Sequence, residues 1–188
     1  MILMSRYEIR FGGFGGQGIV TMAVVLGEAI SLVEKKQCVQ TQSYGPEARG
    51  GATKSELVID DVEVDYPKVQ EPDVFVAMSR AAYLEYIGGL KDDGILIIDD
   101  DLVDIEGDLP DGIKIYKIPA TRIADAELGL KQATNVVMLG ALTAITGIVT
   151  PEGLKQQIVE RWPRFKESNL KALDLGLKAG KEAIPFSA

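Results

Sequence analysis

The sequence contains no histidine and a single cysteine, Cys38. Without histidine the chain cannot assemble a Ser-His-Asp or Cys-His nucleophile. A zinc site with nitrogen or sulfur ligands is not plausible either, and one thiolate cannot hold an iron–sulfur cluster. An intramolecular disulfide would need a second cysteine, which fits a protein of the reducing cytoplasm. If the protein belongs to a redox system, its partners must hold the metal.

Long apolar segments are also scarce. Residues 1–6 lack the basic stretch followed by an apolar core that a secretory signal needs. Residues 132–151 carry no charge, but polar side chains, glycines and Pro151 interrupt them. A membrane-spanning helix requires about 20 mostly apolar residues. We therefore interpret this segment as a helix buried within the protein and expect no membrane partner.

Basic residues number 20 against 28 acidic ones, which gives a net charge of −8. Nine of the acids and no base fall between residues 92 and 111, and the other 19 acids nearly balance the bases. Binding to nucleic acid requires clustered lysine and arginine, so nucleic acid is not an expected partner. The run Asp99, Asp100, Asp101 follows an expected strand, where carboxylates would suit Mg²⁺. A solvated loop is the interpretation we favour, because charge runs are usually solvated.

The hydrophobic pattern predicts one α/β domain over residues 1–188. We expect a three-layer, Rossmann-like fold with a mostly parallel sheet, helices on both faces and a helical C-terminal section. Alternating patterns predict strands at 7–11 and 53–59, a short strand is expected at 37–42, and residues 62–65 are expected to add a hairpin arm. Unbroken apolar runs at 74–78 and 95–98 predict central parallel strands, and 113–118 predicts another strand. Helices are expected at 18–35, 81–90, 121–130, 134–146, from Pro151 onward, and at 166–183.

A glycine-rich motif separates the first expected strand from the first helix. Residues 13–18 read Gly-Phe-Gly-Gly-Gln-Gly, which matches the G-x-G-x-x-G spacing. Such a loop lets an anion approach the positive end of a helix, or it serves as a tight turn that packs closely against a neighbour. A dinucleotide site also expects an acid at the end of the second strand, but residues 40–43 contain none. The lysine of an ATPase P-loop is absent as well.

Several segments together resemble one protein family. They are GFGGQGI at 13–19, QTQSYGPEARGG at 40–51, DYP at 65–67, PDV at 72–74 and NVVMLGAL at 135–142. In this order they resemble the gamma subunit of 2-oxoacid:ferredoxin oxidoreductases, closest to the 2-oxoglutarate type, with related pyruvate and ketoisovalerate gamma domains. The resemblance covers residues 6–183.

The resemblance implies a multi-subunit enzyme of class 1.2.7 that decarboxylates a 2-oxoacid, reduces ferredoxin and releases an acyl-CoA. Thiamine diphosphate with Mg²⁺ is expected on the alpha and beta subunits, and iron–sulfur clusters on other subunits, including a ferredoxin-like delta subunit where one exists. No cofactor, metal or catalytic residue is expected on this chain alone, and it should be inactive by itself. Its role would be to supply assembly and a surface adjacent to the active site.

The same resemblance places a cofactor-binding or subunit-interface surface on two loops. Its residues are Gly13, Gly15, Gly16, Gln17, Gly18, Tyr44, Gly45, Glu47, Arg49, Gly50 and Gly51. The guanidinium of Arg49 suits a carboxylate or phosphate, with an ordinary ion pair as the alternative. We expect Tyr44 to be a packed anchor and Asn135 to be a helix cap.

Three functions remain open from the sequence. The first is the gamma subunit described above, with ferredoxin docking on another subunit because the acidic segment 92–111 would repel an acidic ferredoxin. The second is the equivalent subunit of an indolepyruvate-type enzyme. The third is a free-standing protein that binds a nucleotide through its glycine loop.

Overall fold

The computed structural model describes residues 6–44 and 52–187, and within them seven strands form one sheet. The order across the sheet is β2-β3-β1-β4-β5-β6-β7. The strands are β1 (Tyr7–Phe14), β2 (Gln37–Tyr44), β3 (Ala52–Asp60), β4 (Val74–Ala77), β5 (Ile95–Asp99), β6 (Lys114–Ile118) and β7 (Phe186–Ser187).

The middle of the sheet is parallel, as predicted. Strands β1, β4, β5 and β6 run in one direction, with Ile9 opposite Val74 and Val76 opposite Ile97. Every residue of β4 is buried, because helices or loops cover both faces of these strands. The unbroken apolar runs in the sequence therefore identified the central strands correctly.

The outer strands are antiparallel, and their arrangement differs from one expectation. Strand β3 pairs with β2 on one side and with β1 on the other, and β7 pairs with β6. The hairpin arm predicted at 62–65 is wrong, because these residues form no strand. Arg6 instead donates hydrogen bonds to the carbonyls of Tyr66 and Lys68, which holds this stretch across the end of the sheet as an irregular connection.

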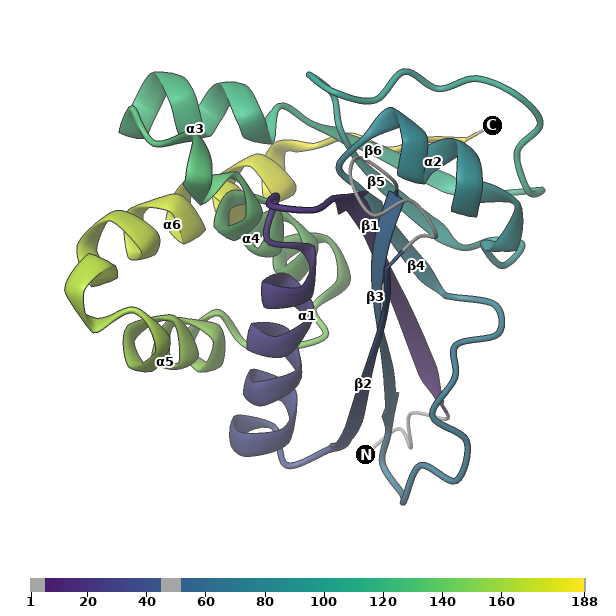
Figure 1. The fold of residues 1–188 in the computed structure, drawn as a ribbon, viewed down its shortest axis with the longest axis horizontal. Helices are drawn as coiled ribbons and strands as arrows, with labels where there is room; N and C mark the ends of the chain where they lie inside the picture. The colour runs from purple at the N-terminus through teal and green to yellow at the C-terminus, as the bar shows by residue number, and fades with distance from the viewer. Residues whose placement is uncertain (1–5, 45–51, 188) are drawn as a thin grey trace.

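Helices cover both faces of the sheet in three layers (Figure 1). Helices α1 and α4 to α6 lie on one side with α3 near the carboxyl ends of the strands, and α2 lies on the other. The helices are α1 (Ile19–Glu28), α2 (Arg80–Tyr86), α3 (Ala120–Leu128), α4 (Thr134–Thr146), α5 (Pro151–Arg161) and α6 (Lys166–Glu182). A π-helical turn η1 (Ala29–Val33) extends α1, and 3₁₀ turns η2 (Ile87–Gly89), η3 (Lys131–Ala133) and η4 (Pro163–Phe165) adjoin α2, α4 and α6.

Helix α4 is the buried helix that the uncharged segment predicted. All of its residues from Thr134 to Thr143 are buried. Among the described helices none combines the length and apolar composition that crossing a bilayer would need.

The next helix, α5, begins as predicted. The Thr150 hydroxyl accepts a hydrogen bond from the Gly153 amide, and Pro151 occupies the first helical position.

Helices α4 and α6 approach each other closely because glycines lie at their contact. A Cβ at Gly176 would overlap the carbonyl oxygen of Val137, and one at Gly140 would overlap that of Leu173. A Cβ at Gly180 would lie 2.6 Å from the carbonyl oxygen of Ala141. The carbonyl oxygens that these Cβ atoms would meet belong to the backbone, so no side-chain rotation can make room, and the two helices pack at a distance that only glycine allows.

Substitution of Gly176 by alanine should therefore force α6 away from α4. We expect the free energy of unfolding to fall by about 1–3 kcal/mol, the range for overpacking a tight core. Urea denaturation followed by circular dichroism measures this loss. Gly88→Ala is the control, since a Cβ at Gly88 meets nothing within 4 Å; equal stability of the two variants would contradict the role given to the glycines.

Candidate functional site

The glycine motif forms the junction between β1 and α1. Gly13 lies inside β1, so the strand extends further than the sequence predicted. Gly16 and Gly18 have φ values of +92° and +76°, which only glycine adopts readily. The chain can therefore reverse within four residues, and α1 begins at Ile19 directly beneath the loop.

Gln17 ties this loop to the next strand. Its side-chain oxygen Oε1 accepts a hydrogen bond from the Phe14 amide at 2.6 Å, and its Nε2 donates to the Met78 carbonyl at 2.8 Å. Met78 follows β4, the parallel neighbour of β1. One amide side chain thus cross-links the loop to the carboxyl ends of two strands, so Gln17 is a positioning residue for the loop.

At two of the glycines a Cβ would meet a neighbouring side chain, which would have to move to make room. A Cβ at Gly13 would lie 2.5 Å from Oε1 of Gln17, and one at Gly18 would overlap the side-chain amide of Asn135. Asn135 is not the helix cap that the sequence suggested, because Ala133 occupies the N-cap of α4 and Asn135 lies inside the helix. Its side chain, 8% exposed, packs against the glycine loop instead. The sequence motif that begins at Asn135 was a signal for this contact, but its partner could not be inferred.

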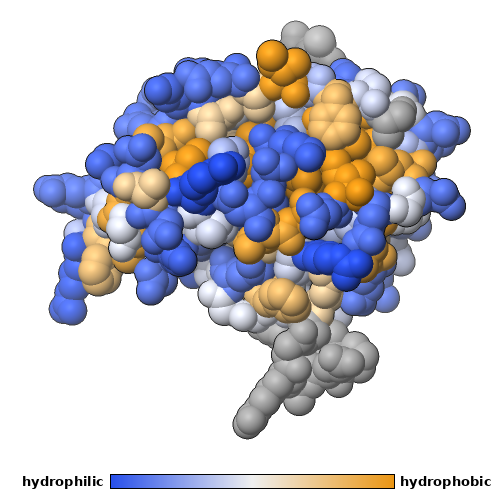
Figure 2. Space-filling view, turned by 90° about the horizontal axis from the view of Figure 1, so that it is seen from above, coloured by the Kyte–Doolittle hydropathy of each residue, from blue (hydrophilic) through white to orange (hydrophobic). Residues whose placement is uncertain are grey.

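The remaining glycines face outward. A Cβ at Gly15 or Gly16 would meet nothing within 4 Å, and both residues are exposed. Gly16 and Gln17 line a cavity of about 250 Å³ whose other walls include Thr121 and Lys131. The cavity lies at the carboxyl ends of the parallel strands, where open α/β sheets place ligands. Figure 2 looks onto this end of the molecule and shows apolar side chains exposed among polar ones.

The residues that flank the second predicted loop lie in the sheet beside the first loop. In the sheet register Tyr44 lies opposite Thr53, and Ala52 lies opposite Phe14, the residue that precedes Gly15. Tyr44 and Ala52, the described residues on either side of segment 45–51, therefore lie near the glycine loop. Of the predicted site residues, Gly45, Glu47, Arg49, Gly50 and Gly51 lie outside the described part of the chain.

The sheet order does not match a dinucleotide-binding unit. In such a unit the strand after the first helix is the parallel neighbour of the first strand, and an acid at its end binds the ribose. Here β3 separates β1 from β2, and β2 ends in Gln42, Ser43 and Tyr44. The glycine loop thus lacks both the neighbouring strand and the acid that hold a ribose.

The three consecutive aspartates are not a solvated loop throughout, which corrects the interpretation made from the sequence. Asp99 is fully buried; its Oδ2 accepts a hydrogen bond from the Thr121 hydroxyl at 2.6 Å, and its Oδ1 accepts one from the Asp101 amide. Asp101 accepts a hydrogen bond from the Arg122 amide in the first turn of α3, and Asp100 pairs with Lys117. Burial raises the pKa of Asp99, and the hydrogen bond from Thr121 opposes this shift. The run anchors the start of α3 beside the glycine loop.

Comparison with known proteins places this fold and loop in a family. The family model described as pyruvate ferredoxin/flavodoxin oxidoreductase matches residues 8–179. The chain belongs to this family. Its sequence is 48% identical, over 94% of this chain and 95% of the relative, to 2-oxoglutarate synthase subunit KorC from Methanocaldococcus jannaschii.

Other family members give the same assignment. The keto/oxoacid ferredoxin oxidoreductase gamma subunit from Geobacter sulfurreducens superposes with a TM-score of 0.86 at 38% identity, over 94% of this chain and 97% of that one. Ketoisovalerate oxidoreductase subunit VorA from Methanothermobacter thermautotrophicus is 30% identical over 94% of this chain, which spans 37% of that longer relative. This family member is therefore a gamma-type subunit of a 2-oxoacid:ferredoxin oxidoreductase, as the sequence motifs predicted.

Removing the Gln17 cross-link should loosen the loop of this gamma subunit. Gln17→Leu deletes two hydrogen bonds, each worth about 0.5–1.5 kcal/mol, so we expect a loss of about 1–3 kcal/mol in unfolding free energy. Hydrogen exchange at the Phe14 amide should also become faster. Gln156→Leu is the matched control, since Gln156 bonds only to exposed Glu160 in the described structure; unchanged exchange at Phe14 in Gln17→Leu would contradict the cross-link.

The buried Asp99 should make stability depend on pH in a defined direction. Because its folded pKa is raised, the folded state binds the proton more tightly than the unfolded chain, whose Asp pKa is about 3.9. We therefore compare the unfolding free energies of the wild type and Asp99→Asn. The difference, wild type minus variant, should decrease as the pH rises from about 4 through the pKa that Asp99 has in the folded state. Thr121→Val removes the hydrogen bond that stabilises the ionised form of Asp99, so the pKa of Asp99 should rise further. The decrease in the free-energy difference should then extend to higher pH. A difference that stays constant with pH would refute this account.

Proposed function

We propose that the chain is the gamma subunit of a 2-oxoglutarate:ferredoxin oxidoreductase. The complex would oxidatively decarboxylate 2-oxoglutarate to an acyl-CoA and pass the electrons to ferredoxin in the cytoplasm. The observation that carries the proposal is the 48% identity, over nearly the whole chain, with a 2-oxoglutarate synthase subunit. Identity falls to 30% with the ketoisovalerate relative, which supports 2-oxoglutarate as the substrate.

The residue composition supports a non-catalytic role within the complex. The chain has one cysteine and no histidine, and its described residues contain no cluster of three or more metal-ligating side chains. Thiamine diphosphate with Mg²⁺ would reside on the alpha and beta subunits. Iron–sulfur clusters need several cysteine thiolates, of which this chain has one, so they would reside on partner subunits such as a ferredoxin-like delta subunit. Bound thiamine diphosphate supplies the carbanion stabilisation that decarboxylation of a 2-oxoacid needs.

The glycine loop would supply the surface that the partner subunits contact. Gly15 and Gly16 have no side chains and face open space, so a partner backbone or a bound cofactor can come close to the loop. Gln17 and Asn135 hold the loop in place from below, which lowers the entropy lost on docking. The adjoining segment 45–51 adds Arg49, whose guanidinium suits a carboxylate or phosphate.

Assembly and activity can be tested together with the complete complex. The chain is co-produced with its partner subunits, and ferredoxin reduction is measured with 2-oxoglutarate, pyruvate, 2-ketoisovalerate and indolepyruvate as alternative substrates. We expect activity with 2-oxoglutarate only when this chain is present, and none from the chain alone. Preference for indolepyruvate, or tight saturable binding of NAD, FAD or ATP to the isolated chain, would contradict the proposal.

A single substitution tests the loop within the same complex. Gly15→Leu adds a side chain that points into open space, so it should leave the stability of the isolated chain unchanged. If a partner docks there, the affinity for the partner subunits should fall by about tenfold or more, as for changes at the centre of an interface. Gly88→Leu places the same side chain at another exposed glycine and should assemble normally.

A further inference from the structure

A second cavity lies beside the glycine loop, between the ends of four helices. It has a volume of about 470 Å³ and shares Gln132 with the cavity described above. Asn135, which packs on Gly18 of the glycine loop, also forms part of its wall. We call it the helix-end pocket. It is thus continuous with the surface to which the proposed function assigns subunit contact.

Two buried amide side chains face this pocket without full hydrogen bonding. Asn135 and Asn169 are 8% and 9% exposed, and both line the pocket. The Oδ1 of Asn135 accepts a hydrogen bond from the Val136 amide. Within the described residues no hydrogen bond to Nδ2 of Asn135 or to the side-chain amide of Asn169 is formed, and these atoms remain open to solvent in the pocket. Neither amide is among the fully buried side-chain atoms that lack a partner in the described residues, so both are accessible from the pocket and can bind a polar group from outside the chain.

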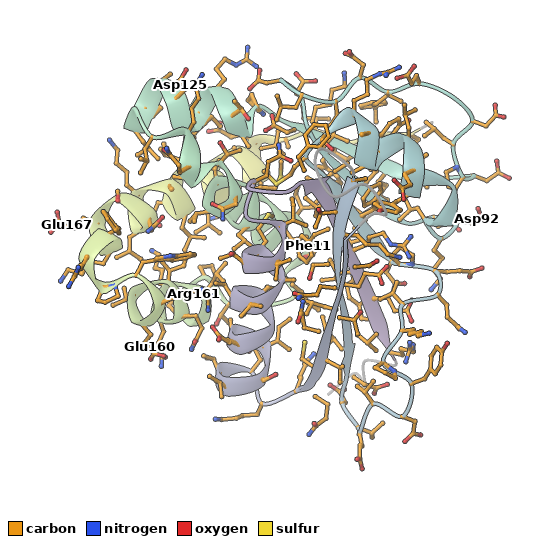
Figure 3. All side chains as sticks on the ribbon, viewed as in Figure 1. Phe11, Asp92, Asp125, Glu160, Arg161 and Glu167 are labelled. Atoms are coloured by element: carbon orange, nitrogen blue, oxygen red, sulfur yellow. The ribbon has the colours of Figure 1, made fainter. Side chains whose placement is uncertain are left out.

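The electrostatics of the pocket favour a negative group. Thr21, Asn135 and Asn169 belong to the first turns of α1, α4 and α6, and none of these helices has a side-chain N-cap. Helix N-termini carry partial positive charge. Among the described residues that line the pocket, Arg161 is the only one with a charged side chain, and Figure 3 labels it near the end of α5. Nη1 of Arg161 lies 3.7 Å from Oε1 of Glu28 in α1. This distance is long for an ion pair, so the Arg161 guanidinium can still bind a second carboxylate.

The rim of the pocket is aromatic. Phe165 is 63% exposed, and the half-buried Trp162 stands beside it with the Arg161 guanidinium 5.9 Å from its ring centre. Leu130 and Val136 supply an apolar floor. An exposed aromatic rim around a partly apolar pocket, with a single arginine, is the composition of a hot spot in a protein interface. The pocket therefore suits a peptide segment better than a free inorganic anion.

The lengths of relatives indicate which partner would occupy it. The ketoisovalerate relative contains a region similar to 94% of this chain, and that region makes up only 37% of its length. In that relative the gamma-like region is covalently joined to a larger polypeptide. Where the gamma subunit is a separate chain, a non-covalent contact must replace that link.

We propose that the helix-end pocket binds a segment of the partner subunit that corresponds to the remainder of the longer relative. The segment presents an apolar or aromatic side chain to Phe165 and Trp162 and a carboxylate to Arg161 and Asn169. This inference rests on the proposed function, and it adds a second docking point with a defined chemistry next to the glycine loop.

Two substitutions test the pocket in the assembled complex. The chain carries an affinity tag and is co-produced with its partner subunits, and the dissociation constant of the purified gamma subunit from them is measured by titration. Phe165→Ala removes the apolar contact and Arg161→Glu reverses the charge, and each should weaken binding by about tenfold or more. Thermal unfolding of the isolated variants establishes that each still folds.

The controls are matched in chemistry and differ in location. Leu32→Ala removes an exposed apolar side chain outside the pocket, and Arg164→Glu makes the same charge change three residues beyond Arg161. Both should bind as the wild type does. If the wild type assembles and the two pocket variants bind equally well, the pocket proposal is overturned while the proposed function stands. Failure of the wild type itself to assemble would overturn both.

A small-molecule occupant is the other outcome that would reject the inference. Inorganic phosphate is titrated into the isolated wild-type chain and into Arg161→Glu while the melting temperature is recorded. A saturable increase in the wild type that is absent in the variant would assign the pocket to a free anion. Partner binding that depends on Phe165 and Arg161 but not on Arg164 would support the docking segment.

Discussion

The close contact between α4 and α6 is the constraint on which the rest of the structure depends. Glycines at positions 140, 176 and 180 let the two backbones touch, and ten consecutive residues of α4, Thr134–Thr143, are buried in the apolar core that α4 shares with α1 and the sheet. The position of α4 in turn sets where Asn135 lies against Gly18. The α4–α6 contact thus fixes the helix on which the placement of Asn135 beneath the glycine loop depends.

The elements that the sequence predicted well are those whose pattern has one physical explanation. The apolar runs that became β4 and β5 could only be satisfied by burial on both faces. The uncharged segment that became α4 could only be a buried helix once its polar residues excluded a membrane. The Thr150-Pro151 start of α5 was readable because a cap, a fixed φ and an early acid agree there.

The failures arose where long-range contacts override a local pattern. Residues 62–65 alternate as a strand would, but Arg6 binds the carbonyls that follow them, and no sheet edge is available beside β3. Asp99 looked solvated because its neighbours are charged, and only the position of Thr121 explains its burial. The glycine loop itself was predicted from its spacing, whereas the packing of Asn135 on Gly18 depends on a fold that brings together residues far apart in sequence.

The place of β1 in the sheet has a consequence for how the chain folds. Strand β1, the first of the described strands, lies between β3 and β4, and it pairs with both of them only across long stretches of intervening sequence. Strands β2 and β3 lie close together in sequence, as do β4 and β5, so each pair can meet without β1. Insertion of β1 between β3 and β4 joins the two halves of the sheet. It also closes the long chain segments that separate β1 from its partners, and closing long segments costs the most conformational entropy. The same event creates the glycine loop, because its scaffold is the junction of these halves; the region that contacts partners is completed only when the sheet is whole.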